Sequence, residues 1–397
     1  MKKHLGKNHH ILLLSFFIIA AVSQVFGQYP TDSAKVSLLT LSPGSETYAA
    51  FGHSAIHVLD RKQGIDYVYN YGTFDFSTPN FYPKFASGRL MYCLSASYYT
   101  DFFAAYQSWG QAMWEQKLNL TNKEKWQLIK NLQINYQQEN RYYRYAFFRD
   151  NCSTRIRDII EKSVDGRIVY DSGYIEKTKS YRQLYSACLD YREPWALFGI
   201  DFLMGKETDS IAGLRGCMFL PKNLMNLFTS AVITSNSSIR MLSDAPVELY
   251  PSALVFPKPN PLAGPVVIFW ALFIIVAGLT YLERKKNWNI KLFDAILFTV
   301  SGLLGLLILI LMVFSLHVEL WSNYNIIWAN PVNLIFAITV FMKNKPRWII
   351  NLIRGYGLLL IIFIPLALLK VQVVSAPTYP LVGILLVRIA GILYTNK

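Results

Sequence analysis

The sequence predicts an exported α+β domain followed by an all-α membrane domain of five transmembrane helices. Three observations lead to this prediction. A basic start, MKKHLGKNHH, precedes the short apolar run ILLLSFFIIAAV, which is typical of a secretory signal peptide. Residues 28–262 then alternate between strand-like and helix-like patterns, as in a globular domain. Residues 263–397 hold five apolar stretches that are long enough to cross a bilayer.

The domain boundaries follow from these patterns. We expect a signal peptide over residues 1–27, which ends in Val25-Phe26-Gly27, and an exported catalytic domain over residues 28–262. The membrane domain takes up residues 263–397. Its apolar stretches lie at 265–282, 293–316, 326–342, 348–369 and 379–395.

Basic residues in the loops predict the orientation of the membrane domain. The loops after the first and third stretches are rich in Lys and Arg, whereas the second loop, HVELWSNYN, has none. Because positive loops stay in the cytoplasm, the chain before residue 263 is expected on the outer face. The signal peptide predicts the same side, so we expect a multi-pass protein of the bacterial inner membrane with a periplasmic catalytic domain.

The charge of the chain argues against a nucleic-acid partner. The net charge is +14, but residues 263–397 carry 11 Lys and Arg against 3 acidic residues. Most of the excess therefore accompanies the apolar stretches, and the polar domain has no basic stripe. An integral membrane protein accounts for the charge better than a nucleic-acid-binding protein does.

The first half of the exported domain is predicted to contain strands. KVSLLTLS is a strand-like run, and FGHSAIHVLD alternates well enough for a second strand. Gln63-Gly64 offers a turn into IDYVYNYGTF, which makes a hairpin with His53 near its open end. MWEQKLNL is expected to form a further strand.

Two helices are predicted from their capping signals. Thr121, followed three residues later by Glu124, is expected to cap a helix that extends to about Tyr136. Asn151 directly precedes a second amphipathic segment, CSTRIRDII. Residues 166–255 carry no clear pattern, and a proline-rich link leads from there into the first apolar stretch.

Cys152, at the start of this second helix, is the candidate nucleophile. The positive end of the helix dipole and its unpaired N–H groups stabilise a thiolate, and they can also hold an oxyanion. His53 is the candidate base, because an imidazole titrating near neutrality can take the thiol proton. The alternative is a structural pair, with Cys152 buried as a small apolar residue and His53 satisfied within its strand.

A third group is needed to fix the ring of the histidine. Asn70 is preferred, because it lies nearest to the level of His53 across the hairpin, and Asp75 is the other candidate. His57 lies on the same strand face as His53 and could support the site, although a half-exposed position is the simpler expectation. Asn151 is expected to support the helix start.

The remaining cysteines, Cys93, Cys188 and Cys217, lie in the exported domain, where disulfides are permitted. A bridge between Cys188 and Cys217 is one of three possible pairings, and the sequence does not choose among them. No C-x-x-C or H-x-x-H spacing occurs, so no zinc site is expected.

The loop between the second and third stretches is polar and aromatic. His317, Asn323 and Asn325 lie in it. An interfacial belt explains the loop as well as a polar lip near the exported domain does, since Trp and Tyr collect at membrane interfaces. Both readings stay open at this point.

Several segments together resemble one family, the Lnb-type lipoprotein N-acyltransferases, and more distantly the lecithin:retinol acyltransferase group. They are FGHSAIHVLD, VYNYGTFDF, KFASGRLMY, EQKLNLT, RYYRYAFFRDNCSTRIRDII and the multi-span tail. The resemblance implies a circularly permuted papain-like domain, because His53 precedes Cys152. It also implies Cys152 as nucleophile and His53 as base, and it matches His317, Asn323 and Asn325 to an outer-loop pattern. His57 is a departure, since an arginine is expected there.

The activity implied is acyl transfer from a membrane phospholipid to the α-amine of the diacylglyceryl-cysteine of lipoproteins, through a Cys152 thioester. This mechanism needs no metal and no diffusible cofactor. Two other classes remain open. A hydrolase with the same Cys–His pair would cleave phospholipid esters or cell-wall peptides, with water as the acceptor. A non-enzymatic envelope protein would bind a partner and would not need Cys152.

Overall fold

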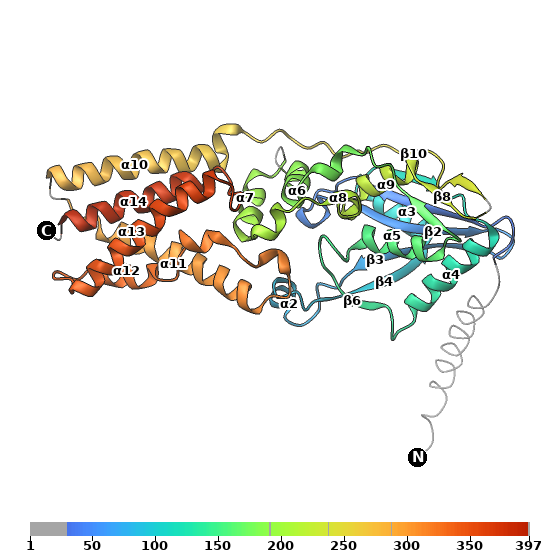
Figure 1. Cartoon of the computed structure of the whole chain (residues 1–397), viewed down its shortest axis with the longest axis horizontal. Helices are drawn as coiled ribbons and strands as arrows, with labels where there is room; N and C mark the ends of the chain where they lie inside the picture. Colours follow the sequence, from blue (N-terminus) through green and yellow to red (C-terminus); the bar gives the residue numbers. More distant parts are fainter. Residues whose placement is uncertain (1–29, 190–191, 237, 287, 396–397) are drawn as a thin grey trace, which may run out of the picture. The chain divides into compact units, whose positions relative to one another are not determined.

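The computed structural model describes residues 30–189, 192–236, 238–286 and 288–395 (Figure 1). The predicted signal peptide therefore lies outside the described residues. The contacts divide the chain into two compact units that interleave in sequence. The first unit contains residues 30–75, 91–174 and 218–254, and the second contains residues 76–90, 175–217 and 255–395, apart from the undescribed positions.

Seven strands of the first unit form one antiparallel sheet in the order β10-β5-β1-β2-β3-β4-β6. They are β1 (Lys35–Leu41), β2 (His53–Asp60), β3 (Ile65–Thr73), β4 (Met91–Tyr98), β5 (Met113–Lys117), β6 (Tyr142–Arg144) and β10 (Val247–Tyr250). A second, three-stranded sheet contains β7 (Arg167–Val169), β8 (Val232–Thr234) and β9 (Ile239–Met241).

The predicted hairpin is present and forms the centre of the large sheet. Its strands β2 and β3 pair from Asp60 opposite Ile65 to Ile56 opposite Tyr69. Gly64 occupies the turn with a φ of +66°, a backbone conformation that favours glycine. This register leaves the start of β2 at the open end of the hairpin, where the candidate site lies.

Helices cover both faces of the large sheet. Ser54 of β2 hydrogen-bonds through its hydroxyl to Ser153 of α5 at 3.1 Å, whereas its neighbour Ala55 packs in an apolar cluster with Phe102 of α3. Successive strand residues point to opposite faces, so His53 shares the α3 face with Ala55. The helices of this unit are α3 (Tyr99–Ser108), α4 (Asn122–Tyr136), α5 (Cys152–Ser163) and α9 (Pro221–Ser230), and η1 (Thr47–Ala49) is a 3₁₀ turn.

The second unit is helical over most of its length. Its outer segments are α2 (Phe81–Ala86), η2 (Ile175–Thr178), α6 (Tyr181–Leu189), α7 (Pro194–Leu203), η3 (Lys206–Asp209), α8 (Gly213–Gly216) and η4 (Cys217–Phe219), the last of which ends in the first unit. The C-terminal part contains η5 (Pro261–Ala263), α10 (Pro265–Lys286), α11 (Lys291–Phe314), η6 (Val318–Leu320), η7 (Tyr324–Ile327), α12 (Asn333–Thr339), α13 (Arg347–Leu368) and α14 (Thr378–Thr395). An apolar core between α11, α12, α13 and α14 holds this part together.

Among the described residues, three helices are long and apolar enough to cross a membrane, namely α10, α11 and α13. They match three of the five predicted stretches. A fourth stretch, 379–395, coincides with the shorter apolar helix α14. The five-span arrangement therefore stays a prediction.

The continuous helix expected over residues 326–342 is not present. The chain forms the 3₁₀ turn η7 and the short helix α12 instead, because Pro331 lacks an N–H and interrupts the helical ladder between them. The segment packs closely on α11, where a Cβ at Gly305 would lie 2.3 Å from the Ala329 carbonyl oxygen. A glycine on α11 thus allows an irregular segment to fit against it.

Candidate active site

Asn151 fixes the start of helix α5. Its Oδ1 accepts a hydrogen bond from the Thr154 N–H at 2.9 Å, and the Thr154 hydroxyl accepts one from the Asn151 N–H at 2.8 Å. The Asn151 amide also donates to the carbonyl oxygens of Phe147 at 2.9 Å and Phe219 at 2.8 Å. This capping box holds Cys152, the first residue of α5, at the end of the helix where N–H groups lack helical partners.

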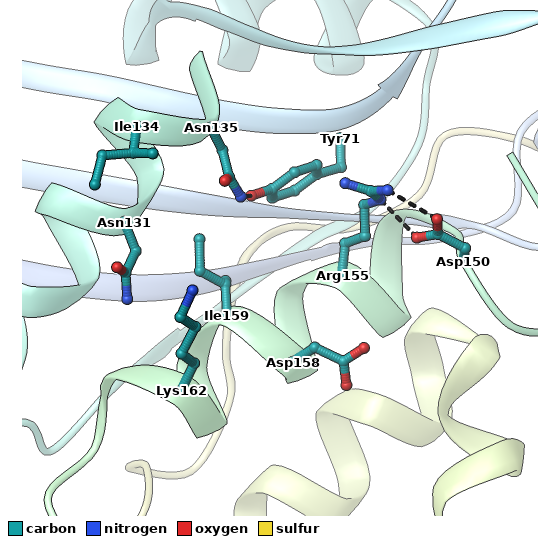
Figure 2. Close-up of a pocket in the computed structure, with 9 residues that line it drawn as sticks. All are labelled: Tyr71, Asn131, Ile134, Asn135, Asp150, Arg155, Asp158, Ile159 and Lys162. Carbon is teal, nitrogen blue, oxygen red and sulfur yellow. Dashed lines mark hydrogen bonds and ion pairs between the residues drawn. The ribbon is translucent and has the colours of Figure 1, made fainter. Parts of the chain in front are cut away.

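A charged pair supports the same helix start. Arg155 donates two hydrogen bonds to the Asp150 carboxylate, at 2.6 and 2.8 Å, and its guanidinium lies 3.4 Å from the centre of the Tyr143 ring. Figure 2 shows this pair inside a cavity of about 310 Å³. The cavity is lined by Tyr71, Asn131, Ile134, Asn135, Asp150, Arg155, Asp158, Ile159 and Lys162. Cys152 is not among the lining residues, so the cavity lies beside the cysteine cluster and is not part of it.

The structure brings Cys152, His53 and Asn70 together. The Nε2 atom of His53 lies 2.5 Å from Oδ1 of Asn70 on the neighbouring strand β3. The histidine side chain also hydrogen-bonds to Cys152. Because Asn70 occupies Nε2, Nδ1 is the ring nitrogen that is left for the thiol. Asp75, the other candidate for the third position, is exposed and follows the end of β3.

Gly72 makes room for this arrangement. Its φ of +89° is a conformation that favours glycine, and it lies in an irregular part of β3. A Cβ at this position would lie 3.6 Å from the Cβ of Cys152 and 3.9 Å from Cε1 of His53. The backbone of β3 therefore approaches both reactive side chains closely.

The electrostatic surroundings favour an ion pair of thiolate and imidazolium. Burial raises the pKa of the Cys152 thiol, but the attraction and hydrogen bond of His53 outweigh it, with help from the Ser54 N–H and the Ser153 hydroxyl, and the pKa is lowered. Burial lowers the pKa of His53, yet the attraction of Cys152 and the hydrogen bonds of Cys152 and Asn70 raise it. The two shifts are in the directions that activate a cysteine nucleophile.

Two tyrosines complete the surroundings of the cysteine, and the sequence patterns did not single them out. Tyr145 hydrogen-bonds to Cys152 through its side chain, and burial raises the pKa of its hydroxyl well above the usual range. Its ring stacks on Tyr92, with 4.5 Å between the centroids. Tyr106 of α3 stacks on His53 at 6.2 Å. The sequence indicates a place near the thiol only for Tyr145, which lies in the segment RYYRYAFF shortly before Cys152.

His57 is buried, with 5% of its surface exposed, and is not half-exposed as expected. Its Nε2 lies 2.8 Å from Asp66 Oδ1, and its Nδ1 lies 3.1 Å from Glu115 Oε1. The ring stacks on Tyr99 of α3 at 4.2 Å, so the helix that covers this face explains the burial. Both ring nitrogens face carboxylates, and His57 therefore makes hydrogen bonds within the sheet rather than a contact to Cys152.

The outer-loop residues His317, Asn323 and Asn325 belong to the second unit. Asn323 donates to the carbonyl oxygens of Phe202 and Leu203, each at 2.9 Å, and Asn325 also donates to Phe202 at 3.0 Å. These bonds satisfy the last carbonyl groups of α7. His317 contacts the Phe85 carbonyl oxygen at 3.0 Å. In this structure the two asparagines join the loop to α7.

All four cysteines are thiols, and the bridge between Cys188 and Cys217 is not formed. Each of these two thiols hydrogen-bonds to a carbonyl oxygen three or four residues earlier in the chain. Among the described residues, no group of three or more His, Cys, Asp and Glu side chains is arranged to hold a metal ion.

Comparison with known proteins gives two matches to family models. The model of the Lnb N-terminal periplasmic domain matches residues 21–187, and the model of the Lnb transmembrane domain matches residues 258–397. No curated protein and no solved structure was found to match the chain. The two models together cover the strands and helix that carry Cys152, His53 and Asn70, as well as all three spanning helices.

Proposed function

The chain belongs to the Lnb family, and from this we propose that it is a lipoprotein N-acyltransferase with Cys152 as its nucleophile. Family membership implies an acyltransferase in the inner membrane with a periplasmic N-terminal domain. The observation that carries the assignment of Cys152 is its position at the capped start of α5, in hydrogen-bond contact with His53. Asn70 is assigned the third place, because it contacts the other side of the histidine ring.

In the first half-reaction, the Cys152 thiolate attacks the carbonyl carbon of a phospholipid acyl ester. Negative charge develops on the carbonyl oxygen, and the N–H groups at the start of α5 and the Tyr145 hydroxyl can stabilise it. The intermediate collapses by breaking the ester C–O bond. The protonated His53 gives its proton to the departing oxygen, so a lysophospholipid leaves and an acyl thioester remains on Cys152.

In the second half-reaction, the α-amine of the lipoprotein's diacylglyceryl-cysteine attacks the thioester. His53 takes a proton from the attacking nitrogen, and the C–S bond breaks to release the Cys152 thiolate. The product is an amide at the lipoprotein N-terminus. Each step uses only groups of this chain and its two substrates.

The proposed fold of the exported domain is permuted papain-like. Support comes from the order and placement of the three residues: His53 begins a strand, Asn70 lies on the next strand, and Cys152 begins a later helix. The five-span membrane domain is part of the same proposal. Spanning helices keep an enzyme beside both lipid substrates, whereas a soluble enzyme must extract an acyl chain at a cost of about 0.8 kcal/mol per CH₂ group.

Mass spectrometry of lipoprotein N-termini tests the proposal. Cells that carry the intact protein are expected to show N-acylated lipoproteins, and cells with Cys152→Ala are expected to show free α-amines. Cys188→Ser is the matched control, because it removes a thiol of the second unit and should leave acylation unchanged. Acylation that persists with Cys152→Ala would contradict the proposal.

Intact-mass analysis of the purified protein tests the covalent step separately. Incubation with phospholipid alone should add one acyl mass to the chain, and Cys152→Ala should abolish the addition. Release of free fatty acid in the absence of any amine, at the rate at which phospholipid is consumed, would favour a hydrolase instead.

A further inference from the structure

The segment KFASGRLMY, residues 84–92, ends in strand β4, but its first part does not belong to the unit that contains the sheet. Residues 76–90, which include the short helix α2, belong to the second unit. They bind the end of the spanning helix α11, as Figure 1 also shows. The segment therefore belongs to the second unit, which contains the spanning helices, although in sequence it is part of the predicted exported domain.

Four polar contacts hold the segment to residues 314–317. The Leu316 N–H donates to the Ser87 carbonyl oxygen at 3.0 Å, and the Ser315 hydroxyl donates to the Ala86 carbonyl oxygen at 2.9 Å. Arg89 donates to the Phe314 carbonyl oxygen at 2.8 Å, and the fourth contact is the one between His317 and Phe85. Three of these contacts involve carbonyl groups at the C-terminal end of α2, and the fourth satisfies the Phe314 carbonyl group at the C-terminus of α11.

Gly88 explains why the segment can approach so closely. Its φ of +69° favours glycine, and a Cβ there would lie 3.2 Å from the Cβ of Leu316 and 3.4 Å from the His317 backbone nitrogen. A larger residue would push α2 away from α11. Gly88, within KFASGRLMY, is therefore required for α2 to lie this close to α11.

The aromatic side chains around this contact are strongly exposed. Tyr82 is 75% exposed, Phe76 57% and Phe85 52%, and Phe314 at the end of α11 is 62% exposed. Exposed aromatic side chains thus lie both on this segment and at the end of the spanning helix to which it is hydrogen-bonded. Monomeric proteins rarely leave such a patch open to water, so it needs an occupant.

The length of α11 identifies the occupant. Its 24 residues extend for about 36 Å, somewhat more than the roughly 30 Å of a bilayer's hydrocarbon core. Phe314 therefore lies at the level of the lipid head groups, where aromatic side chains collect. Lys84, in the last turn of α2, adds a cation that suits lipid phosphates.

We propose that residues 76–90, docked on the end of α11, form a surface whose aromatic side chains insert among the phospholipids of the outer leaflet. This role depends on the spanning helices of the second unit and is separate from acyl transfer. Residues 76–90 take no part in the proposed catalytic steps.

Site-specific photo-crosslinking in native membranes tests this surface. Benzoylphenylalanine replaces Tyr82 in the full chain, and the membranes are irradiated. The intact mass of the purified protein is then measured by mass spectrometry. A phospholipid adduct is the expected result. Ile274, 68% exposed in the middle of α10, serves as the positive control, and Ile239, 74% exposed on β9 of the first unit, tests whether exposure alone gives adducts.

Two outcomes would overturn the proposal: an adduct of protein mass at position 82, or no adduct there while position 274 is crosslinked. The same replacement at Phe85 provides a second probe if the first variant does not accumulate in the membrane. Crosslinking does not depend on turnover. A lipid adduct in a protein that fails to N-acylate lipoproteins would therefore contradict the proposed function and leave this inference standing.

Discussion

The Nε2 atom of His53 lies 2.5 Å from Oδ1 of Asn70, across two adjacent strands. This contact fixes the orientation of the imidazole and directs its other nitrogen to Cys152. An acceptor on Nε2 also holds the proton on that atom, so Nδ1 is available to take the proton of the thiol. The geometry explains how a buried cysteine can be activated in the absence of a charged third residue.

Removing the Asn70 contact should weaken catalysis while the fold is retained. Asn70→Ala is expected to slow acylation of Cys152 by about 100-fold, at the low end of what a positioned acid–base group contributes. Asn70→Gln keeps the amide but displaces it, so its acylation rate should lie between those of the intact protein and of Asn70→Ala. Thioester formation followed by intact mass gives the rates, and an Asn70→Ala rate equal to that of the intact protein would contradict the assignment.

The thiol of Cys152 should ionise at lower pH than an ordinary cysteine. Attraction and a hydrogen bond from His53 outweigh burial and lower its pKa below the ordinary 9.0, whereas burial raises the pKa of Cys93 despite the nearby Arg141. Iodoacetamide labelling followed across pH by peptide mass spectrometry should therefore give a midpoint below 9.0 for Cys152. His53→Ala should move that midpoint upward.

Cys93 is the internal control for this measurement, because its thiol lies on β4 and should titrate above 9.0 in both proteins. A Cys152 midpoint at or above that of Cys93 would mean that no thiolate–imidazolium pair forms.

Tyr145 should contribute a hydrogen bond to the transition state. Its hydroxyl stays protonated because burial raises its pKa, and it hydrogen-bonds to Cys152. Tyr145→Phe is expected to lower the acylation rate by about 10²-fold, as removal of one oxyanion donor does. Tyr142→Phe, on the exposed end of β6, should leave the rate unchanged. Equal rates for the two variants would rule out a catalytic role for Tyr145.

A buried charge cluster should stabilise the C-terminal helices of the second unit. Arg388 of α14 donates to both Asp294 oxygens, at 2.5 and 2.7 Å, and to Glu283 at 2.8 Å. Arg388→Leu leaves two carboxylates without their cation and is expected to cost about 3–5 kcal/mol of unfolding free energy. Thermal unfolding in nanodiscs measures the loss. Arg354→Leu, on an exposed face of α13, should change the midpoint little.

Adding Asp294→Leu to the Arg388→Leu variant should recover part of the lost stability, because it removes one of the uncompensated charges. If the double variant is less stable than the single one, the cluster does not act as an ion pair.

Several elements were predictable because their signals are local. The turn at Gly64, the capping box of Thr121 and Glu124 and the cap at Asn151 are each decided by residues within a few positions of one another. The apolar stretches of α10, α11 and α13 were predictable for the same reason. The stretch after Asn325 was predicted wrongly as one helix. Pro331 is a local signal against a continuous helix, whereas the close approach that Gly305 allows depends on a distant part of the chain.

The sequence by itself determined that a cysteine begins a helix, that a histidine begins a strand, and that both precede a membrane domain. Only the tertiary structure decided which groups meet there. It placed Asn70 against the ring, brought Tyr145 to the thiol, and buried His57 under α3. It also carried residues 76–90 away from the sheet to α11. These arrangements depend on contacts between residues far apart in the chain. A local sequence pattern does not show which of those contacts form.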